Sequence, residues 1–127
     1  MSKQKIMNKW LATFAPDIPE EIMSGHVIGN YCHLWHIFTW GKVSCLEADS
    51  ARQAFDQLEF ERAIMFTGGY TFDNETNIND LGYVTKSSAS ASELEDIDDV
   101  YIIGEDFSWT YVHTHEPECG PYFVNLD

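Results

Sequence analysis

Two short apolar segments separated by a polar turn constrain this sequence more than any other feature. Val100-Tyr101-Ile102-Ile103 is followed by the turn Gly104-Glu105-Asp106-Phe107 and then by residues Ser108 to His113. β-Branched and aromatic residues on both sides of a turn that contains glycine are typical of an antiparallel hairpin. The sequence therefore predicts a C-terminal hairpin over residues 100–113, within a mainly antiparallel sheet.

Apolar residues at helical spacing predict helices at the N-terminus and in the middle of the chain. The first stripe ends before Pro16 and consists of Ile6, Met7, Trp10, Leu11 and Phe14. A short second helix is expected from Pro19 to about Met23, because acidic residues follow the proline in its first turn. Asp49 or Ser50 can cap a third helix, whose buried face holds Ala51, Ala54, Phe55 and Leu58.

The remaining segments are assigned to strands and loops. Residues Asn30 to Trp40 are dense in aromatic and β-branched side chains, which favours a buried strand, although periodicity alone leaves a helix open. Ala63 to Phe66 is a short apolar run before Gly68 and Gly69, as expected for an interior strand. The polar segments Thr71–Asp80 and Lys86–Ser92 are expected to be loops.

These assignments fit one domain over residues 1–127. With 127 residues, 44% of them hydrophobic, the chain can bury a single core, and it shows no internal repeat or second apolar nucleus. The fold class is therefore predicted as α+β. N-terminal helices and one middle helix are expected to pack on the antiparallel sheet.

The charge of the chain is strongly negative and unevenly placed. There are 21 acidic residues against 7 basic ones, for a net charge of -14, and no Lys or Arg follows Lys86. This distribution opposes binding to nucleic acid or an anionic membrane and favours a basic protein partner. The expected partner-binding residues are Glu93, Glu95, Asp96, Asp98, Asp99, Glu105 and Asp106. A solvated face that only keeps the protein soluble is the alternative reading.

The N-terminus and the cysteines indicate a cytoplasmic protein. Lys3, Lys5 and Lys9 interrupt the apolar residues of the N-terminus, so the continuous apolar core of a signal peptide is missing. The three cysteines cannot all pair within one chain, which favours reduced thiols. No apolar run approaches the roughly 20 residues that span a bilayer.

Metal binding and catalysis find limited support in the sequence. Candidate ligands are Cys32, His33, His36, His113, His115 and Cys119. In a strand, His33 and His36 point to opposite faces, whereas His113 and His115 share a face with Trp109 and Tyr111. That face is explained equally well by a row of packed aromatic side chains. The paired cysteines of structural zinc sites are absent, so we expect no metal and no cofactor.

Cysteine catalysis and nucleotide binding are not expected either. The carboxylates beside Cys119 would raise a thiol pKa, whereas a catalytic thiolate needs a lowered one. Gly68-Gly69 lacks the residues that complete a phosphate-binding loop. We therefore assign no catalytic residue.

Two stretches resemble a bacterial family of unknown function, number four-two-seven-five. They are Tyr31-Cys32-His33-Leu34-Trp35-His36-Ile37-Phe38, followed by Lys42-Val43-Ser44-Cys45-Leu46 and Ala51 to Phe55, and Trp109-Thr110-Tyr111-Val112-His113-Thr114-His115-Glu116, with Gly120-Pro121-Tyr122-Phe123. Members of that family are small intracellular proteins, mostly of Bacillus-like bacteria, and some resemble immunity proteins encoded beside toxins. The resemblance covers most of the chain after Asn30 and implies no activity.

Three hypotheses follow for the function. The first is an acidic protein-binding domain of the immunity or antitoxin type, which neutralises a cognate toxin such as a nuclease. The second is a small metal- or His-dependent enzyme, and the third is a regulatory interaction module. Core packing and a functional site explain the family residues Trp35, His36, Trp109, His115 and Glu116 equally well. The possible site consists of Trp35, His36, Trp109, His113, His115 and Glu116.

Overall fold

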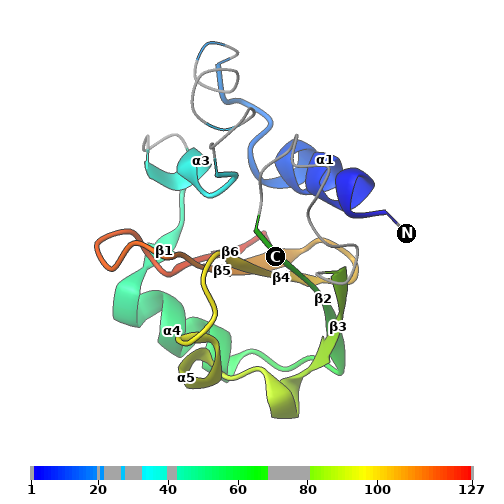
Figure 1. The fold of residues 1–127 in the computed structure, drawn as a ribbon, viewed down its shortest axis with the longest axis vertical. Helices are drawn as coiled ribbons and strands as arrows, with labels where there is room; N and C mark the ends of the chain where they lie inside the picture. Colours follow the sequence, from blue (N-terminus) through cyan, green and yellow to red (C-terminus); the bar gives the residue numbers. More distant parts are fainter. Residues whose placement is uncertain are drawn as a thin grey trace.

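The protein folds as an antiparallel sheet with helices on both faces (Figure 1). The computed structural model describes residues 2–19, 21, 27, 33–39, 43–68 and 81–126. Helices α1 (Lys3–Phe14) and α3 (His36–Thr39) cover one face, and α4 (Ala48–Gln57) and α5 (Ala91–Leu94) cover the other. The three layers confirm the predicted α+β fold with an N-terminal and a middle helix on the sheet.

The sheet has six strands within the described residues. They are β1 (Leu46–Glu47), β2 (Arg62–Thr67), β3 (Leu81–Thr85), β4 (Val100–Gly104), β5 (Trp109–His113) and β6 (Tyr122–Asn125). Their order is β1-β6-β5-β4-β2-β3, and each neighbouring pair is antiparallel. The predicted hairpin is β4–β5, with Val100 opposite His113, and it continues into β6. The predicted interior strand is β2, which lies between β4 and β3.

Helix α1 follows the predicted apolar stripe. The Ser2 side chain caps it by accepting a hydrogen bond of 3.2 Å from the Lys5 backbone N–H. Its buried residues are Ile6, Met7, Trp10, Leu11 and Phe14. The helix ends at Phe14 because Pro16 disfavours the helical conformation at Ala15, whose φ and ψ are -137 and 50°.

The predicted strand over residues 30–40 is wrong in its described part. Residues 33–35 form a turn, and His36–Thr39 form α3. Leu34, Trp35 and Ile37 are buried against α1 and the sheet without pairing to any strand. The aromatic residues that suggested a strand are thus buried between layers, where a short helix meets the same need for burial.

Three other predicted segments either differ in detail from the structure or lie outside its described residues. Helix α4 starts at Ala48, and neither Asp49 nor Ser50 caps it, because Glu47 holds the cap position. The predicted loop 86–92 contains a 3₁₀ turn (Lys86–Ser88) and the start of α5, which the Ser90 side chain caps. The predicted helix at 19–23, apart from Pro19 and Glu21, and the predicted loop at 71–80 lie outside the described residues.

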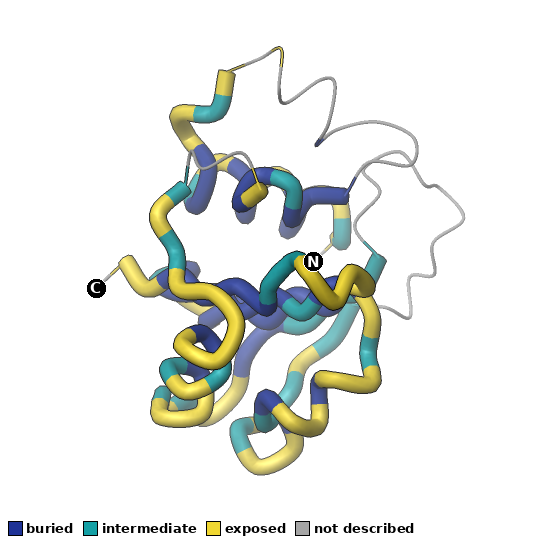
Figure 2. Tube along the Cα trace, turned by 90° about the vertical axis from the view of Figure 1, so that its left-hand side faces the viewer, coloured by how far each residue is buried: buried dark blue, intermediate teal, exposed yellow. Residues whose placement is uncertain are grey.

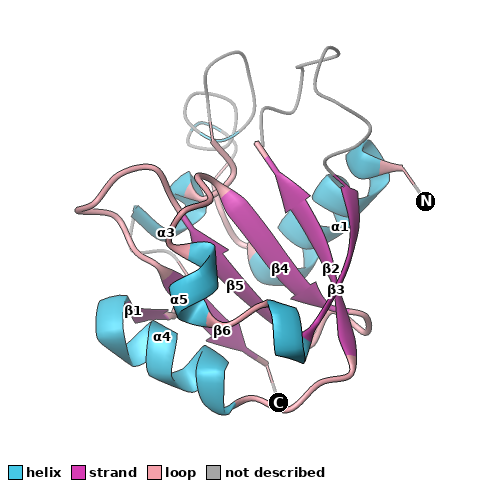
Figure 3. Cartoon of the chain, turned by 60° about the horizontal axis from the view of Figure 1, so that its bottom comes forward, coloured by secondary structure: helices cyan, strands magenta, loops and turns pink. Residues whose placement is uncertain are grey.

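Strand β4 joins the two cores of the molecule. Its residues Tyr101 and Ile103 face α1, while Val100 and Ile102 face α4 and α5. All five residues are buried, which explains why the strand reads as a continuous apolar run. Figure 2 shows the buried residues along α1 and the central strands, and Figure 3 shows α4 and α5 across one face of the sheet with α1 behind it.

One buried polar pair connects α1 to the sheet. The Trp10 indole N–H donates a hydrogen bond of 3.0 Å to Thr110 Oγ1, and Thr110 Oγ1 donates one of 2.8 Å to the Ile102 carbonyl oxygen. Trp10 is fully buried, so this bond satisfies a donor that would otherwise be costly.

Among the described residues, no helix is long and apolar enough to cross a membrane.

Close packing at Gly104 gives a first prediction. A Cβ atom at this position would lie 2.5 Å from Trp109 Nε1 and 2.9 Å from Cδ1. The Trp109 ring cannot move away easily, because it is 6% exposed and packs against Phe55 and Phe60. Gly104→Ala should therefore lower the free energy of unfolding by about 1–3 kcal/mol in urea titrations followed by circular dichroism.

Gly82→Ala is the matched control in edge strand β3. A Cβ atom there meets nothing within 4 Å, so this variant should be as stable as the parent or about 0.4–1 kcal/mol more stable. Equal stability of the two alanine variants would contradict the packing described at Gly104.

Candidate functional site

The candidate site is built around the carboxylate of Asp99. This residue immediately precedes β4 and has a left-handed backbone with φ of 53°. Aspartate tolerates this conformation better than most residues, because its short side chain can bond locally. Asp99 is only 9% exposed, so its charge lies inside the protein. Buried charges need partners, and the surrounding residues supply them.

Two residues hold the Asp99 carboxylate by hydrogen bonds. The Trp35 indole Nε1 donates to Oδ1 over 2.8 Å, and the His115 backbone N–H donates to the same oxygen over 3.2 Å. The His115 ring Nδ1 lies 3.0 Å from each carboxylate oxygen. Trp35 is itself positioned by its backbone N–H, which donates to Tyr101 Oη over 3.0 Å. The carboxylate thus joins the turn before α3 to the loop after β5.

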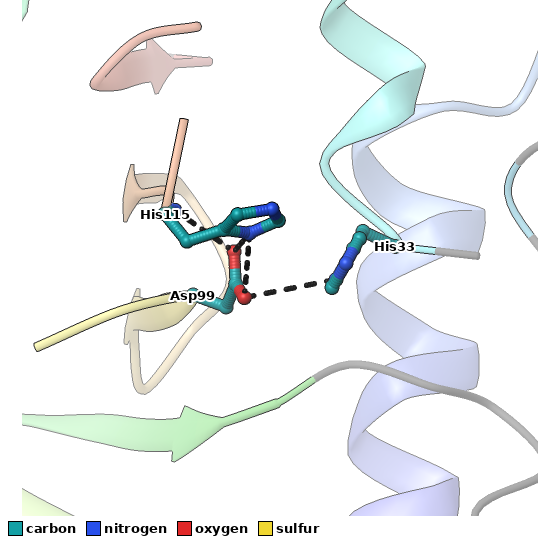
Figure 4. A group of neighbouring side chains, drawn as sticks. All are labelled: His33, Asp99 and His115. Atoms are coloured by element: carbon teal, nitrogen blue, oxygen red, sulfur yellow. Dashed lines mark hydrogen bonds and ion pairs between the residues drawn. The ribbon is translucent and has the colours of Figure 1, made fainter. Parts of the chain in front are cut away.

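His33 completes a group of three side chains, shown in Figure 4. Its Nδ1 lies 3.8 Å from Asp99 Oδ2, which is longer than a hydrogen bond. The His33 and His115 rings are 4.9 Å apart at their centroids, and His33 stacks on Trp35 at 5.3 Å with an interplanar angle of 17°. His33 and His115 therefore approach one carboxylate from different segments of the chain.

The two imidazoles differ in their electrostatics. The hydrogen bond with Asp99 raises the pKa of His115, and the charges of Asp99 and Glu116 add to this effect while partial burial opposes it. Burial lowers the pKa of His33, and the charge of Asp99 offsets only part of this effect. Asp99 thus faces one histidine that favours its protonated form and one that favours its neutral form.

Glu116 contacts the outer side of His115. Its Oε1 lies 3.1 Å from His115 Nε2, so both ring nitrogens of His115 face a carboxylate. The side chains of Glu116 and His115 are 51% and 36% exposed, whereas that of Asp99 is 12% exposed. The group therefore reaches from the interior to the surface.

The chemistry open to this group follows from its donor atoms. His33, Asp99 and His115 each offer one ligand atom, and these atoms lie within 4.8 Å of one another, so the three residues could hold a metal ion. The Asp99–His115 pair also has the arrangement of an oriented general base. Within the described residues, however, no hydroxyl or thiol hydrogen-bonds to the His115 ring, so a nucleophile for the pair is not seen there.

The structure brings together four of the six residues predicted for the possible site. Trp35, His36, His115 and Glu116 are neighbours, and the His36 ring lies 4.1 Å from the Trp35 ring. Trp109 and His113 lie on the other face of the sheet. Trp109 packs against Phe55 and Phe60. The prediction that His113 and His115 share a face is wrong, because the strand ends at His113.

His113 has its own partners on the α5 side of the sheet. Its Nδ1 lies 2.9 Å from the Ile97 carbonyl oxygen, and its Nε2 lies 3.2 Å from Glu95 Oε2. Arg52 holds the other oxygen of Glu95 over 2.7 Å. Partial burial raises the pKa of Glu95, but Arg52 and His113 lower it on balance. These contacts explain His113 as part of an ion-pair network.

The sequence predicts Asp99 as one of the partner-binding acids and does not place it with Trp35, His115 and Glu116 in the possible site. A signal was present, because the β4–β5 register puts Val100 opposite His113 and so places the residues just outside the hairpin, Asp99 and His115, near each other. The proposed metal ligand His36 is not in the group of three. Cys32 lies outside the described residues.

Cys45 and Cys119 are free thiols. Cys45 packs against the core, and burial, together with the charge of Glu47, raises its pKa to about 11. A thiol with so high a pKa is a poor nucleophile at neutral pH.

The acidic residues expected to bind a partner fall into separate groups. Glu93, Asp96 and Asp98 are exposed around the start of β4, and Glu116 and Glu118 are exposed on the neighbouring loop after β5. Glu105 and Asp106 lie at the β4–β5 turn, at the opposite end of the strand, where Arg62 pairs with Glu105 at 2.9 Å. Asp99 is buried and contributes no exposed carboxylate.

Comparison with protein families identifies the family of the chain. The model of the family described as "Domain of unknown function (DUF4275)" matches residues 3–123, so the protein belongs to this family. This match confirms the family resemblance seen in the sequence. The search of curated proteins and the search of solved structures found no match. The family description names no activity, so the function must be argued from the side chains.

The Asp99–His115 contact predicts a change in a measurable pKa. Asp99→Asn removes the charge and most of the hydrogen bond that raise the pKa of His115, so this pKa should fall in NMR titrations of the metal-free protein. A raised folded-state pKa stabilises the protein below the unfolded value of 6.5 and no longer does so once pH exceeds the folded-state pKa. The stability lost in Asp99→Asn should therefore be larger at pH 6 than at pH 9.

Asp98→Asn is the matched control, because Asp98 is exposed and no hydrogen bond or ion pair joins it to His115 in the described residues. It removes the same charge one residue away. A His115 pKa that moves equally in the two variants would show that the direct contact is not its cause.

Proposed function

We propose that this member of the DUF4275 family is a cytoplasmic protein-binding domain that docks on a basic partner through one acidic end of its sheet. We call this region the acidic end surface and define it by Glu93, Asp96, Asp98, Glu116 and Glu118. The β4–β5 register supports the proposal, because it places the loop before β4 beside the loop after β5. Asp98 and Glu116, which are distant in the sequence, are thereby brought to neighbouring loops at one end of the sheet.

The absence of basic partners on this surface is the observation that carries the proposal. Among the described residues, no Lys or Arg forms an ion pair with any of the five carboxylates. By contrast, Glu95, which is close to the surface in sequence, and Glu105, which lies at the opposite end of β4, each pair with an arginine. Exposed carboxylates that no Lys or Arg neutralises are the groups that attract and orient a basic protein.

The partner class follows from the same chemistry. A protein that binds phosphate groups presents Arg and Lys donors, and a cluster of carboxylates offers them anionic oxygens in place of phosphate. We therefore propose an immunity or antitoxin type of role, in which the acidic end surface covers the basic groove of a toxin such as a nuclease. The net charge of -14 supports rapid association with such a target.

Charge reversal at the acidic end surface tests this proposal. The partner is first co-purified from the native host at low salt and identified by cross-linking and mass spectrometry. The triple variant Asp96→Lys, Asp98→Lys and Glu118→Lys should then associate at least about tenfold more slowly with the purified partner near 50 mM salt, with a weaker dependence on salt. Stopped-flow fluorescence gives both quantities.

A second triple variant controls for total charge. Asp17→Lys, Glu59→Lys and Glu61→Lys change the net charge by the same amount at exposed positions outside the acidic end surface. This control should retain most of the association rate. Equal rates for the parent and the first variant, or equal slowing in both variants, would reject the acidic end surface as the docking site.

A further inference from the structure

We propose that His33, Asp99 and His115 form a binding site for one divalent transition-metal ion of the zinc class. The ligand atoms are His33 Nδ1, Asp99 Oδ2 and His115 Nδ1 (Figure 4). The proposal is independent of partner docking and concerns the group of three residues beneath the acidic end surface. It rests on ligand geometry, on the residues that orient the ligands and on local charge.

The separations of the ligand atoms are close to those of a metal site. Two ligands that each lie about 2.0–2.2 Å from a tetrahedral zinc ion are about 3.4 Å from each other. His115 Nδ1 lies 3.0 Å from Asp99 Oδ2, and His33 Nδ1 lies 3.8 Å from the same oxygen. Each of the three residues offers a ligand atom within 4.8 Å of those of the other two. Small rotations of the imidazole rings therefore bring the ligand atoms to the separations of a metal site.

Neighbouring residues already orient two of the ligands. Trp35 Nε1 donates to Asp99 Oδ1, which leaves Oδ2 directed at both histidines. Glu116 Oε1 lies 3.1 Å from His115 Nε2 and can accept its proton, so Nδ1 is the nitrogen that gives up its hydrogen bond to Asp99 and offers its lone pair when a metal ion binds. A carboxylate or other acceptor behind a histidine ligand fixes its tautomer and ring orientation in metal sites generally.

The charge of the group favours a cation between its members. Asp99 and Glu116 carry carboxylates on the two sides of His115, and no Lys or Arg of the described residues pairs with either. The proton that His115 Nδ1 shares with the two Asp99 oxygens, each 3.0 Å away, marks the position that a cation would take. A metal ion there replaces this proton and coordinates both side chains, and the surrounding acidic end surface attracts the ion.

The donor set indicates which ion would bind. Two imidazole nitrogens and one carboxylate oxygen suit zinc, and they also suit cobalt, nickel and non-haem iron. They do not suit calcium or magnesium, which prefer oxygen ligands only. Three protein ligands leave at least one coordination position for water or for an added ligand, as in sites where zinc is exposed to solvent.

Cobalt provides a direct probe of the site. Full-length protein without a polyhistidine tag is freed of metal with EDTA, dialysed and titrated with Co²⁺ and then with Zn²⁺. We expect visible absorption that saturates at one equivalent of Co²⁺, disappears on addition of Zn²⁺, and gives a zinc Kd of about 1 µM or tighter. The melting temperature should rise with added Zn²⁺.

Substitutions assign the ligands. His33→Gln and His115→Gln should each abolish the cobalt spectrum, and Glu116→Gln should weaken zinc binding about 10–100-fold. His113→Gln and Glu118→Gln make the same chemical changes outside the group and should bind like the parent. Circular dichroism checks that each variant is folded, which matters most for His115→Gln because the His115 ring also holds the buried Asp99 carboxylate.

Two results would overturn the site. One is the absence of a cobalt spectrum and of zinc binding up to about 100 µM in the parent protein. The other is metal binding that survives in the folded variants His33→Gln and His115→Gln. Equal weakening of metal binding by the control His113→Gln and by these two variants would count in the same way. Metal titration uses no partner protein, so its outcome is separate from that of the charge-reversal experiment.

Discussion

The structure depends on a charged group placed where water is largely excluded. Asp99 is 9% exposed, and burial of an ion costs several kcal/mol unless hydrogen bonds or opposite charge offset it. No arginine or lysine of the described residues does so; the indole of Trp35 and the imidazole and backbone of His115 take that role. Because these partners come from two distant segments, satisfying one carboxylate fixes the turn before α3 against the end of β5.

Local patterns account for the elements that could be predicted from sequence. The stripe of α1 has a period of one helical turn because only one side of the helix is buried, and β4 is continuously apolar because both sides are buried. The segment 33–39 lacked such a pattern. Leu34, Trp35 and Ile37 are all buried in a turn and a short helix, so neither a helical nor a strand period could develop.

The candidate site was only partly predictable for a related reason. The histidines and Trp35 stand out by their chemistry, but Asp99 lies in a run of acidic residues and differs from its neighbours only by burial. Burial depends on tertiary packing, which the sequence of that run does not reveal. Strands β1 and β6 are similar cases, since residues 46–47 and 122–123 pair across most of the chain and carry no local turn signal.

The position of β6 affects how the molecule reaches this structure. β6 is the last strand in sequence, yet it lies inside the sheet, between β1 and β5. Until it is added, β1 has no partner and β5 presents a bare edge to other chains. The Trp10–Thr110 bond also joins residues 100 positions apart, so much of the assembly waits until β5 and β6 have been synthesised. Most of the acidic residues precede β6 in the sequence, so such incomplete chains are also negatively charged and repel one another.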